Sequence, residues 1–292
     1  MVALISALAF ATNLTLASVV YTAGGNVHAL NLARSAAFTV LMLGAVVLAR
    51  ASLRMTRSQR AAACALGLLF CMELYAILLA IAFIPVGLAI LIMYTYPLMV
   101  SAVAWLSGRE RFTLDAGCAV LAAFAGLALA LHSPEGLPDW RGVALALAAA
   151  VGLASLLIAT ERMLFALDRR VVVLHLSATA TAAVVVVTAV LGELAWPAGT
   201  TGWLAFGGST VFYALATFLL FAALELIGPF RTAVIDNAAP VFAIFLAAVL
   251  LDEHLSTVQI FGGALVIAAV VLVQIGAAVP VPSGSVRRQP EA

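Results

Sequence analysis

Residues 86–107 read VGLAILIMYTYPLMVSAVAWLS and contain no acidic or basic side chain. A helix needs about 20 apolar residues to cross a bilayer core about 30 Å thick, and this stretch is long enough to do so. Within lipid, backbone polar groups must find partners inside the protein, and a helix satisfies them within its own segment. The stretch therefore predicts a membrane-spanning helix, with Pro97 near its middle.

The rest of the chain has the same character. Of its 292 residues, 65% are hydrophobic and 9% are charged, whereas about 25% of the residues of a typical soluble domain are charged. Ten apolar runs of sufficient length are predicted, at 3–21, 32–48, 62–83, 86–107, 114–131, 142–159, 171–191, 203–224, 229–251 and 257–277. The predicted fold class is an all-α integral membrane protein with ten transmembrane helices, and a soluble globular fold is excluded.

The arginines indicate how these helices are oriented. All 14 basic residues are arginine. With the N-terminus in the cytoplasm, the cytoplasmic loops and tail hold Arg50, Arg54, Arg57, Arg60, Arg109, Arg111, Arg162, Arg169, Arg170, Arg231, Arg287 and Arg288. The outer loops hold Arg141 alone, and Arg34 lies near the outer end of the second helix. This bias is typical of the positive-inside rule. Together with a composition typical of a bacterial genome, it predicts a multi-pass protein of the bacterial inner (cytoplasmic) membrane with both termini cytoplasmic.

An internal repeat appears when the chain is shifted by 143 residues. Pro97 then aligns with Pro240, and Glu110 with Glu253. The predicted organisation is a first five-helix repeat at 1–131, an external linker at 132–141, a second five-helix repeat at 142–278 and a disordered cytoplasmic tail at 279–292. Because five is an odd number, the second copy must enter the membrane in the opposite orientation. Inverted repeats of this kind are typical of secondary transporters.

Several short stretches carry a resemblance to a known family that covers nearly the whole chain. In the first half, AIAFIP at 80–85 leads to YTYP at 94–97 and then to Glu110 and Arg111; in the second, ALELI at 223–227 leads to Ala239, Pro240 and EHLS at 253–256. Together with Asn13 and Arg34, these stretches resemble the EamA branch of the drug/metabolite transporter superfamily. The resemblance implies a central cavity lined by helices 1–4 and 6–9, and export of amino acids, drugs or other small metabolites. The chain departs from the family's pattern at Arg109 and Asp252, where a glycine usually precedes the glutamate.

Polar side chains inside the predicted helices are the candidates for solute or proton binding. A charge at the bilayer centre costs about 2.5–3.5 kcal/mol on insertion scales, so such residues usually face a cavity or a partner. The candidates are Glu73, Tyr94, Asp236, Asn237, Asn13 and Arg34. Glu73 and Asp236 are the candidate proton carriers. The alternatives are a protonated packing role for Glu73, interhelical hydrogen bonding for Asn13 and Asp236, and snorkelling of Arg34 to the outer surface.

Two prolines and one charged pair are candidates for moving parts. Pro97 and Pro240 each lack an amide hydrogen and free a carbonyl group one turn earlier, so we expect either a hinge or a plain kink at each. Glu225 and Arg231 are predicted at the cytoplasmic ends of helices 8 and 9. They are gate candidates, with snorkelling at the membrane interface as the alternative.

Motifs for other chemistry are absent from the sequence. It has no phosphate-binding loop, dinucleotide fingerprint, zinc-protease motif or nucleophile elbow, so we predict no enzymatic activity, no metal and no cofactor. The expected function is secondary transport by alternating access, with export of a small polar metabolite, amino acid or drug-like solute, either proton-coupled or by exchange. A membrane channel, a sensor and an intramembrane enzyme are the alternatives. The expected partners are a small-molecule substrate and the lipid bilayer, without nucleic acid, in a monomer or a homodimer.

Overall fold

A computed structural model describes residues 1–106, 114–130, 137–164, 168–192, 194–236, 238–252 and 256–277. Within these ranges the chain is built of helices and turns and contains no β-strand. The helices are α1 (Val2–Thr22), α2 (Val27–Leu48), α3 (Arg57–Ala80), α4 (Val86–Met93), α5 (Tyr96–Leu106), α6 (Leu114–Ala130), α7 (Trp140–Leu164), α8 (Arg169–Leu191), α9 (Gly199–Asp236), α10 (Ala239–Leu250) and α11 (Thr257–Ala277). The all-α class predicted from the sequence is confirmed.

Six segments of these helices are long and apolar enough to cross a membrane. They are Val2–Thr22, Val27–Leu48, Arg57–Ala80, Trp140–Ala159, Arg169–Leu191 and Gly199–Ala223. Four shorter apolar segments accompany them, at Val86–Val100, Gly117–Ala130, Ala239–Leu250 and Thr257–Leu272. The chain is a multi-pass membrane protein.

The helix predicted over 86–107 is interrupted. It forms two helices, α4 and α5, because the first ends at Met93 and the second begins at Tyr96. Pro97, which has no amide hydrogen to donate into a preceding turn, lies in the first turn of α5. The disturbance predicted near the middle of this run is therefore a break between two helices, and Pro97 lies in the first turn of the second helix.

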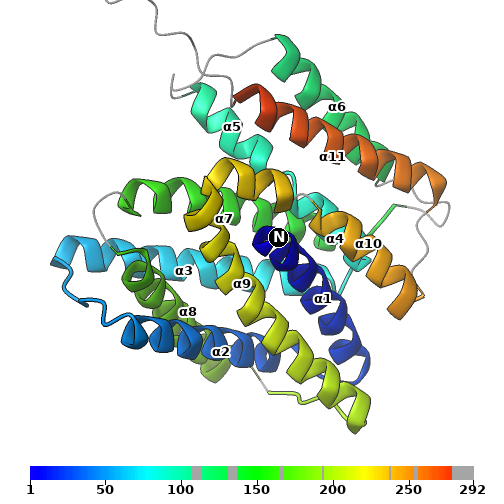
Figure 1. The fold of residues 1–292 in the computed structure, drawn as a ribbon. Helices are drawn as coiled ribbons and strands as arrows, with labels where there is room; N and C mark the ends of the chain where they lie inside the picture. The colour runs from blue at the N-terminus through cyan, green and yellow to red at the C-terminus, as the bar shows by residue number, and fades with distance from the viewer. Residues whose placement is uncertain are drawn as a thin grey trace, which may run out of the picture.

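The helices predicted at 203–224 and 229–251 also have different boundaries. Helix α9 continues to Asp236, and the chain breaks only before α10. Figure 1 shows α9 turning sharply before its last turns, which run toward α10. The proline at 229 lies in this helix, and a proline bends a helix because it removes one hydrogen bond of the ladder. Pro240 lies in the first turn of α10, so it marks the second interruption.

The helices form one bundle with a separate pair along one edge. α1 packs along α9, α2 packs on α8 and α9, and α3 packs on α7 and α8. α6 and α11 lie side by side at the edge (Figure 1). A Cβ atom added at Gly126 of α6 would lie 2.7 Å from the carbonyl oxygen of Gly262 of α11, so these two backbones touch directly. Small residues allow this close approach between membrane helices.

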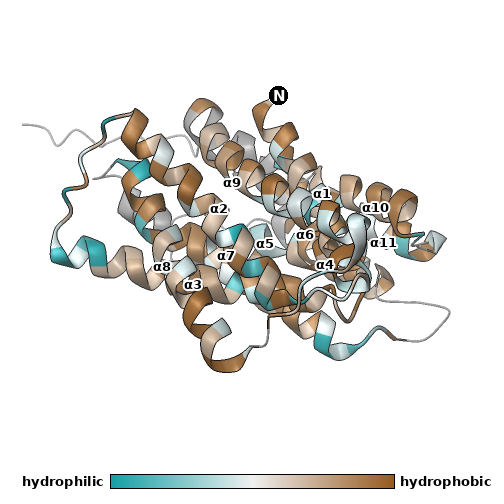
Figure 2. Cartoon of the chain, turned by 90° about the horizontal axis from the view of Figure 1, so that it is seen from below, coloured by the Kyte–Doolittle hydropathy of each residue, from teal (hydrophilic) through white to brown (hydrophobic). Residues whose placement is uncertain are grey.

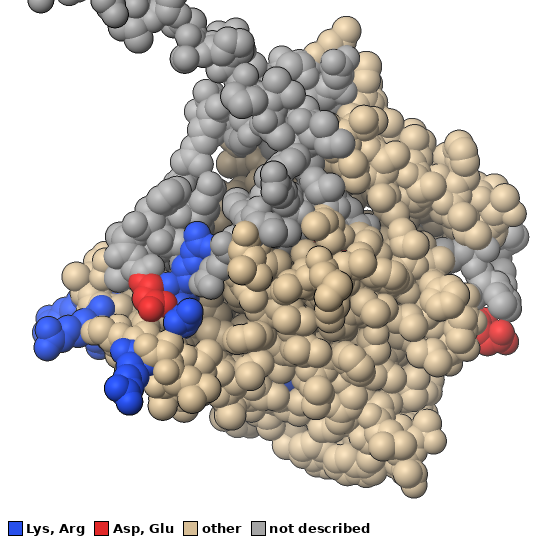
Figure 3. Space-filling view, viewed as in Figure 1, with Lys and Arg blue, Asp and Glu red and all other residues tan. Residues whose placement is uncertain are grey.

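The surface of the bundle divides into an apolar belt and charged ends. Hydrophobic residues dominate the helices in Figure 2, and the middle of the surface in Figure 3 is nearly free of charge. Figure 3 also shows basic side chains gathered at one end of the molecule. We call this the basic end; α2 ends there and α3 and α8 begin there, and it carries Arg54, Arg57, Arg60, Arg169 and Arg170. Such a belt suits lipid contact.

Candidate functional site

The two helix interruptions meet inside the bundle. Tyr94 follows the last residue of α4, and Asp236 is the last residue of α9. The Tyr94 hydroxyl donates a hydrogen bond of 2.9 Å to Oδ2 of Asp236, and both residues are buried. The ring of Tyr96 packs edge-on against Tyr94, with 5.8 Å between the ring centroids. The second carboxylate oxygen of Asp236, Oδ1, is buried and has no hydrogen-bond partner among the described residues.

The backbone at the first interruption is satisfied locally. The amide of Thr95 donates to the carbonyl of Ile92, and the Thr95 hydroxyl donates to the same oxygen at 2.8 Å. The carbonyl of Thr95 accepts from the amide of Leu98. A break in a membrane helix is tolerated where protein groups satisfy the backbone groups that it frees. Irregular backbone beside buried polar side chains is the arrangement found at transporter binding sites.

A second polar centre surrounds Arg34 of α2. This side chain is 1% exposed, so it does not snorkel to the surface. Its guanidinium carbon lies 4.1 Å from the centroid of the Tyr213 ring on α9, a cation–π contact. Within the described part of the chain, Nε and Nη1 of Arg34 have no hydrogen-bond partner. The same holds for both side-chain polar atoms of Asn31, one turn earlier, and for the hydroxyl of Tyr213.

Neighbouring polar groups do not satisfy this Arg34 centre. The hydroxyl of Tyr21 donates to the carbonyl of Leu78 at 2.8 Å. The hydroxyl of Thr217 donates to the backbone carbonyl of Tyr213 at 2.9 Å. Glu73 of α3 is buried and interacts electrostatically with Arg34 across the bundle, but no ion pair joins the two in the described residues. A cation is thus buried among apolar helices, and no described residue supplies an anion bonded directly to it.

Asn13 is held by α9. The hydroxyl of Ser209 lies 3.1 Å from Oδ1 of Asn13 and 3.0 Å from the Asn13 carbonyl oxygen. Ser6, two turns earlier in α1, donates to the carbonyl of Ala216 at 2.9 Å. These contacts are the interhelical hydrogen bonds expected when small polar residues join membrane helices. Asn13 therefore has a hydrogen-bonded packing partner, whereas the described residues provide no such partner for Nε and Nη1 of Arg34.

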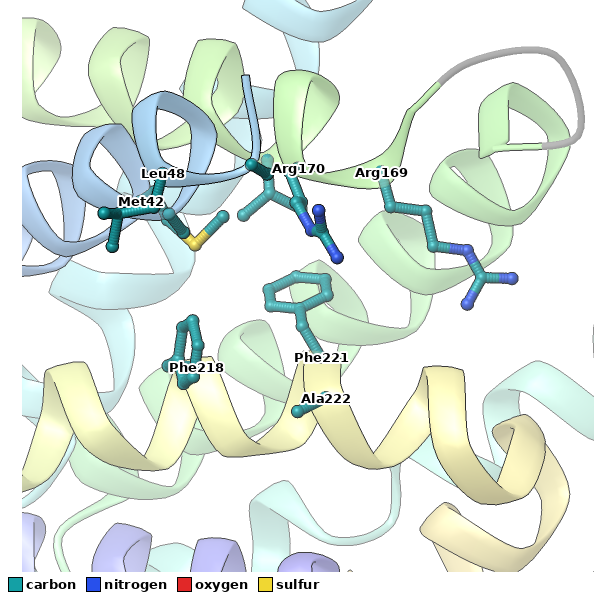
Figure 4. Close-up of a pocket in the computed structure, with 10 residues that line it drawn as sticks. Met42, Leu48, Arg169, Arg170, Phe218, Phe221 and Ala222 are labelled. Carbon is teal, nitrogen blue, oxygen red and sulfur yellow. The ribbon is translucent and has the colours of Figure 1, made fainter. Parts of the chain in front are cut away.

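A cavity of about 400 Å³ opens at the basic end, between α2, α8 and α9 (Figure 4). Its lining includes Met42 of α2, Arg169 and Arg170 of α8, and Phe218 and Phe221 of α9. Small-molecule sites commonly have volumes of about 300–1,000 Å³, apolar walls and a few placed polar groups. The volume of this cavity lies within that range, and its described walls are mostly apolar with two arginines.

The predicted site residues are only partly brought together. Tyr94 and Asp236 touch, whereas Arg34 and Glu73 belong to the other centre, and Asn13 pairs with Ser209. Asn237 lies outside the described residues, and so do the side chains of Glu225 and Arg231. The described residues contain no cluster of metal-binding side chains.

Asn31 and Ser209 are two of the buried polar residues that were not predicted from the sequence. Asn31 precedes Arg34 by three positions, a spacing that places both on one helix face, and this spacing could have identified it. Ser209 is followed by a second hydroxyl residue, Thr210, in an otherwise apolar run, and nothing in the local sequence pairs Ser209 with Asn13.

Residues 140–275 match the model of the EamA-like transporter family. A protein of Synechocystis sp. (strain ATCC 27184 / PCC 6803 / Kazusa) named as an uncharacterized transporter is 29% identical over 221 residues. That alignment covers 71% of this chain and 65%, less than two thirds, of the relative. The crystal structure of a protein that is 20% identical covers 94% of this chain and 98% of its own, with a TM-score of 0.62, and shows a likeness of fold. The second half of the chain therefore carries an EamA-like transporter domain, at residues 140–275.

Proposed function

We propose that the chain is a secondary transporter that exports a small polar solute by alternating access. The two rocking units are an inverted pair of five-helix repeats, residues 1–131 and 142–278, joined by the linker at 132–141 and followed by a tail at 279–292. In this proposal ten spans cross a bacterial inner membrane, and both termini are cytoplasmic.

Matching helix boundaries support the repeat. Helix α4 ends at Met93 and α9 ends at Asp236, 143 positions later. Helices α5 and α10 begin at Tyr96 and Ala239, again 143 positions apart, and the same spacing separates the starts of α6 and α11. The sequence repeat has the same offset, so the interruptions fall at corresponding places in the two copies.

The observation that carries the proposal is the hydrogen bond between Tyr94 and Asp236. It joins the interruption of one repeat to the interruption of the other, at a buried position. Paired discontinuous helices at a repeat interface are where transporters of this architecture bind their cargo. A bond that closes the interface in one state must open when the repeats rock apart, so the pair suits a switch between states.

The other candidate residues take roles around this interface. Asp236 and Glu73 are the proton carriers, since each is an acid within the apolar bundle. Pro97 and Pro240 are the hinges because each begins a helix after an interruption. Arg34 and Asn237 are proposed to contact the solute, and Asn13 contributes through its contact with Ser209. Glu225 and Arg231 remain gate candidates at the cytoplasmic surface.

The test is transport in a defined membrane. Proteoliposomes loaded with an isotope-labelled bacterial metabolite extract are placed in unlabelled buffer, with and without a pH gradient, and the released compounds are identified by mass spectrometry. We expect one compound or one chemical family to leave faster than from protein-free liposomes. Release that equals the protein-free control for every compound would reject transport. Release of all small solutes without saturation would indicate a channel instead.

A further inference from the structure

The buried Arg34 and the cavity at the basic end belong to one continuous arrangement. Phe221, which lines the cavity, stacks on Phe38 with 6.5 Å between ring centroids and 13° between planes. Phe38 then packs edge-on against Tyr213 at 6.3 Å, and Tyr213 lies under the guanidinium of Arg34. Phe38 is 1% exposed. Three aromatic rings in contact, those of Phe221, Phe38 and Tyr213, therefore connect the cavity to the buried Arg34.

The cavity has the charge of an entrance for anions. Arg169 and Arg170 are the two charged side chains among the described residues that line it, and none of those described residues is acidic. Asp168, next to them, caps α8 by accepting a hydrogen bond from the amide of Arg170. Two cations with aromatic walls attract an anion and offer an apolar surface to the rest of the molecule.

Arg34 supplies the inner end of the same path. A buried cation that has an aromatic ring beside it, but no directly bonded anion in the described residues, is costly in a lipid-embedded bundle, so we expect a functional partner for it. Two of the three guanidinium nitrogens have no partner in the described chain, and neither do the Asn31 amide and the Tyr213 hydroxyl beside them. The planar guanidinium group suits carboxylates because its donors match the spacing of two oxygens.

We propose that the solute carried by this chain is a monocarboxylate with an aromatic or branched apolar body, which enters over Arg169 and Arg170 and binds with its carboxylate on Arg34. Phe38, Phe221 and Tyr213 form the plug that separates the two positions and provide the surface for the apolar body. This inference rests on the proposed transport function and adds the substrate class to it.

Equilibrium dialysis of the purified full chain in nanodiscs tests the substrate class. The probes are labelled 3-phenylpropanoate, the neutral 3-phenylpropanamide and the cationic 3-phenylpropylamine, which share one apolar body. We expect saturable binding of the carboxylate, and binding of the other two that is weaker by about tenfold or more, because a hydrogen bond to a charged group is worth that much. Equal affinity for the amide or the amine would overturn the proposal.

Variants then locate the site. Arg34→Met should lower the affinity for 3-phenylpropanoate by about tenfold or more. It should change the melting temperature little, because the loss of the cation–π contact with Tyr213 is offset by the removal of a buried cation that has no directly bonded anion in the described residues. Arg34→Lys keeps the charge and loses the planar group, so its affinity should be intermediate. Arg54→Gln, an exposed change at the same end outside the cavity, is the matched control and should bind as the original chain does.

The outcomes separate the inference from the function. Unchanged carboxylate binding in Arg34→Met, or loss of binding only in the Arg169→Gln and Arg170→Gln double variant, would show binding at the entrance alone and overturn the assignment to Arg34. If Arg34→Met does not fold, the Arg34→Lys result decides in its place. Binding of the carboxylate without its transport in proteoliposomes would reject transport and leave the site intact. Transport of an amine without carboxylate binding would support transport and overturn the proposed carboxylate site.

Discussion

The two buried polar centres of this bundle differ in how their hydrogen bonds are met. At the helix interruptions, Tyr94 and Asp236 bond to each other across the two halves of the chain. Around Arg34, the guanidinium, the Asn31 amide and the Tyr213 hydroxyl have atoms without a partner in the described residues. Both centres are buried among apolar helices, so the difference does not come from exposure.

The difference separates a group that holds the chain together from a group that is ready to bind something else. Lipid offers no water to an unpaired polar atom, so each one costs free energy unless a ligand or a trapped water satisfies it. In the Tyr94–Asp236 pair, the two side chains satisfy each other by a hydrogen bond, and only Oδ1 of Asp236 lacks a partner in the described residues. At the Arg34 centre, the unsatisfied polar atoms would have to be satisfied by a molecule that binds from outside the chain. We therefore interpret the first centre as the switch between states and the second as the solute site.

The largest effect is expected from removing the acid of the paired centre. In Asp236→Asn the hydrogen bond from Tyr94 can persist, because the amide oxygen still accepts, so the fold should survive. A proton can no longer be carried there, and pH-gradient-driven transport should fall by on the order of 10²-fold, while exchange of solute for solute continues. Glu73→Gln is the companion variant for the acid nearer Arg34. Unchanged gradient driving in both proteins would exclude both carriers.

The sequence predicted the helical membrane fold because the requirement is local. A run such as 86–107 must be helical wherever it lies in lipid, and its hydropathy alone reveals it. The positions of the interruptions were harder to predict. Pro97 and Pro240 indicated a disturbance, but a proline bends some helices and begins others, and the choice depends on what packs around it. The proline at 229 lies within α9, whereas Pro240 begins α10.

The site could be predicted only as a set of unusual residues. Charge and polarity in apolar runs selected Arg34, Glu73, Tyr94 and Asp236 without a structure, because such residues are costly in lipid. The pairing was not predictable, since Tyr94 and Asp236 are 142 positions apart and Asn13 and Ser209 are 196 apart. These contacts depend on how α1, α4 and α9 pack, which the local pattern does not contain.

The contact between α6 and α11 provides a reference for the effect of a packing change on stability, because the two helices meet there through glycine backbones and not through buried charges. In Gly126→Ala the new methyl group would meet the carbonyl oxygen of Gly262 at 2.7 Å and the amide nitrogen of Val266 at 2.9 Å. We expect a loss of about 1–3 kcal/mol in the free energy of unfolding, measured by denaturation in detergent, with solute selectivity unchanged. Gly44→Ala is the matched control, because its methyl group would meet nothing within 4 Å. A substitution at Gly126 as mild as the one at Gly44 would mean that α6 and α11 are not in direct contact.

Removing the bond of the paired centre should have a smaller effect. Tyr94→Phe keeps the ring and leaves both oxygens of Asp236 without a partner, so it should cost about 1 kcal/mol of stability, a typical value for hydrogen bonds between membrane helices. Tyr96→Phe changes the neighbouring ring, which makes no hydrogen bond to Asp236 in the described chain. A melting temperature that falls equally in both variants would indicate loss of packing and not loss of this bond.

A tyrosine-to-phenylalanine substitution at the Arg34 centre should have the smallest effect on stability. Tyr213→Phe removes a buried hydroxyl that has no hydrogen-bond partner within the described residues. The melting temperature should therefore stay the same or rise, because the substitution removes an unsatisfied polar group and breaks no hydrogen bond. Binding of a carboxylate should weaken by about two- to tenfold if that hydroxyl donates to it. The comparison thus predicts opposite outcomes for one substitution: Tyr94→Phe destabilises the chain, and Tyr213→Phe weakens ligand binding alone. A stability loss at Tyr213 as large as that at Tyr94 would mean that the hydroxyl already has a partner within the protein, and the distinction between the two centres would then be wrong.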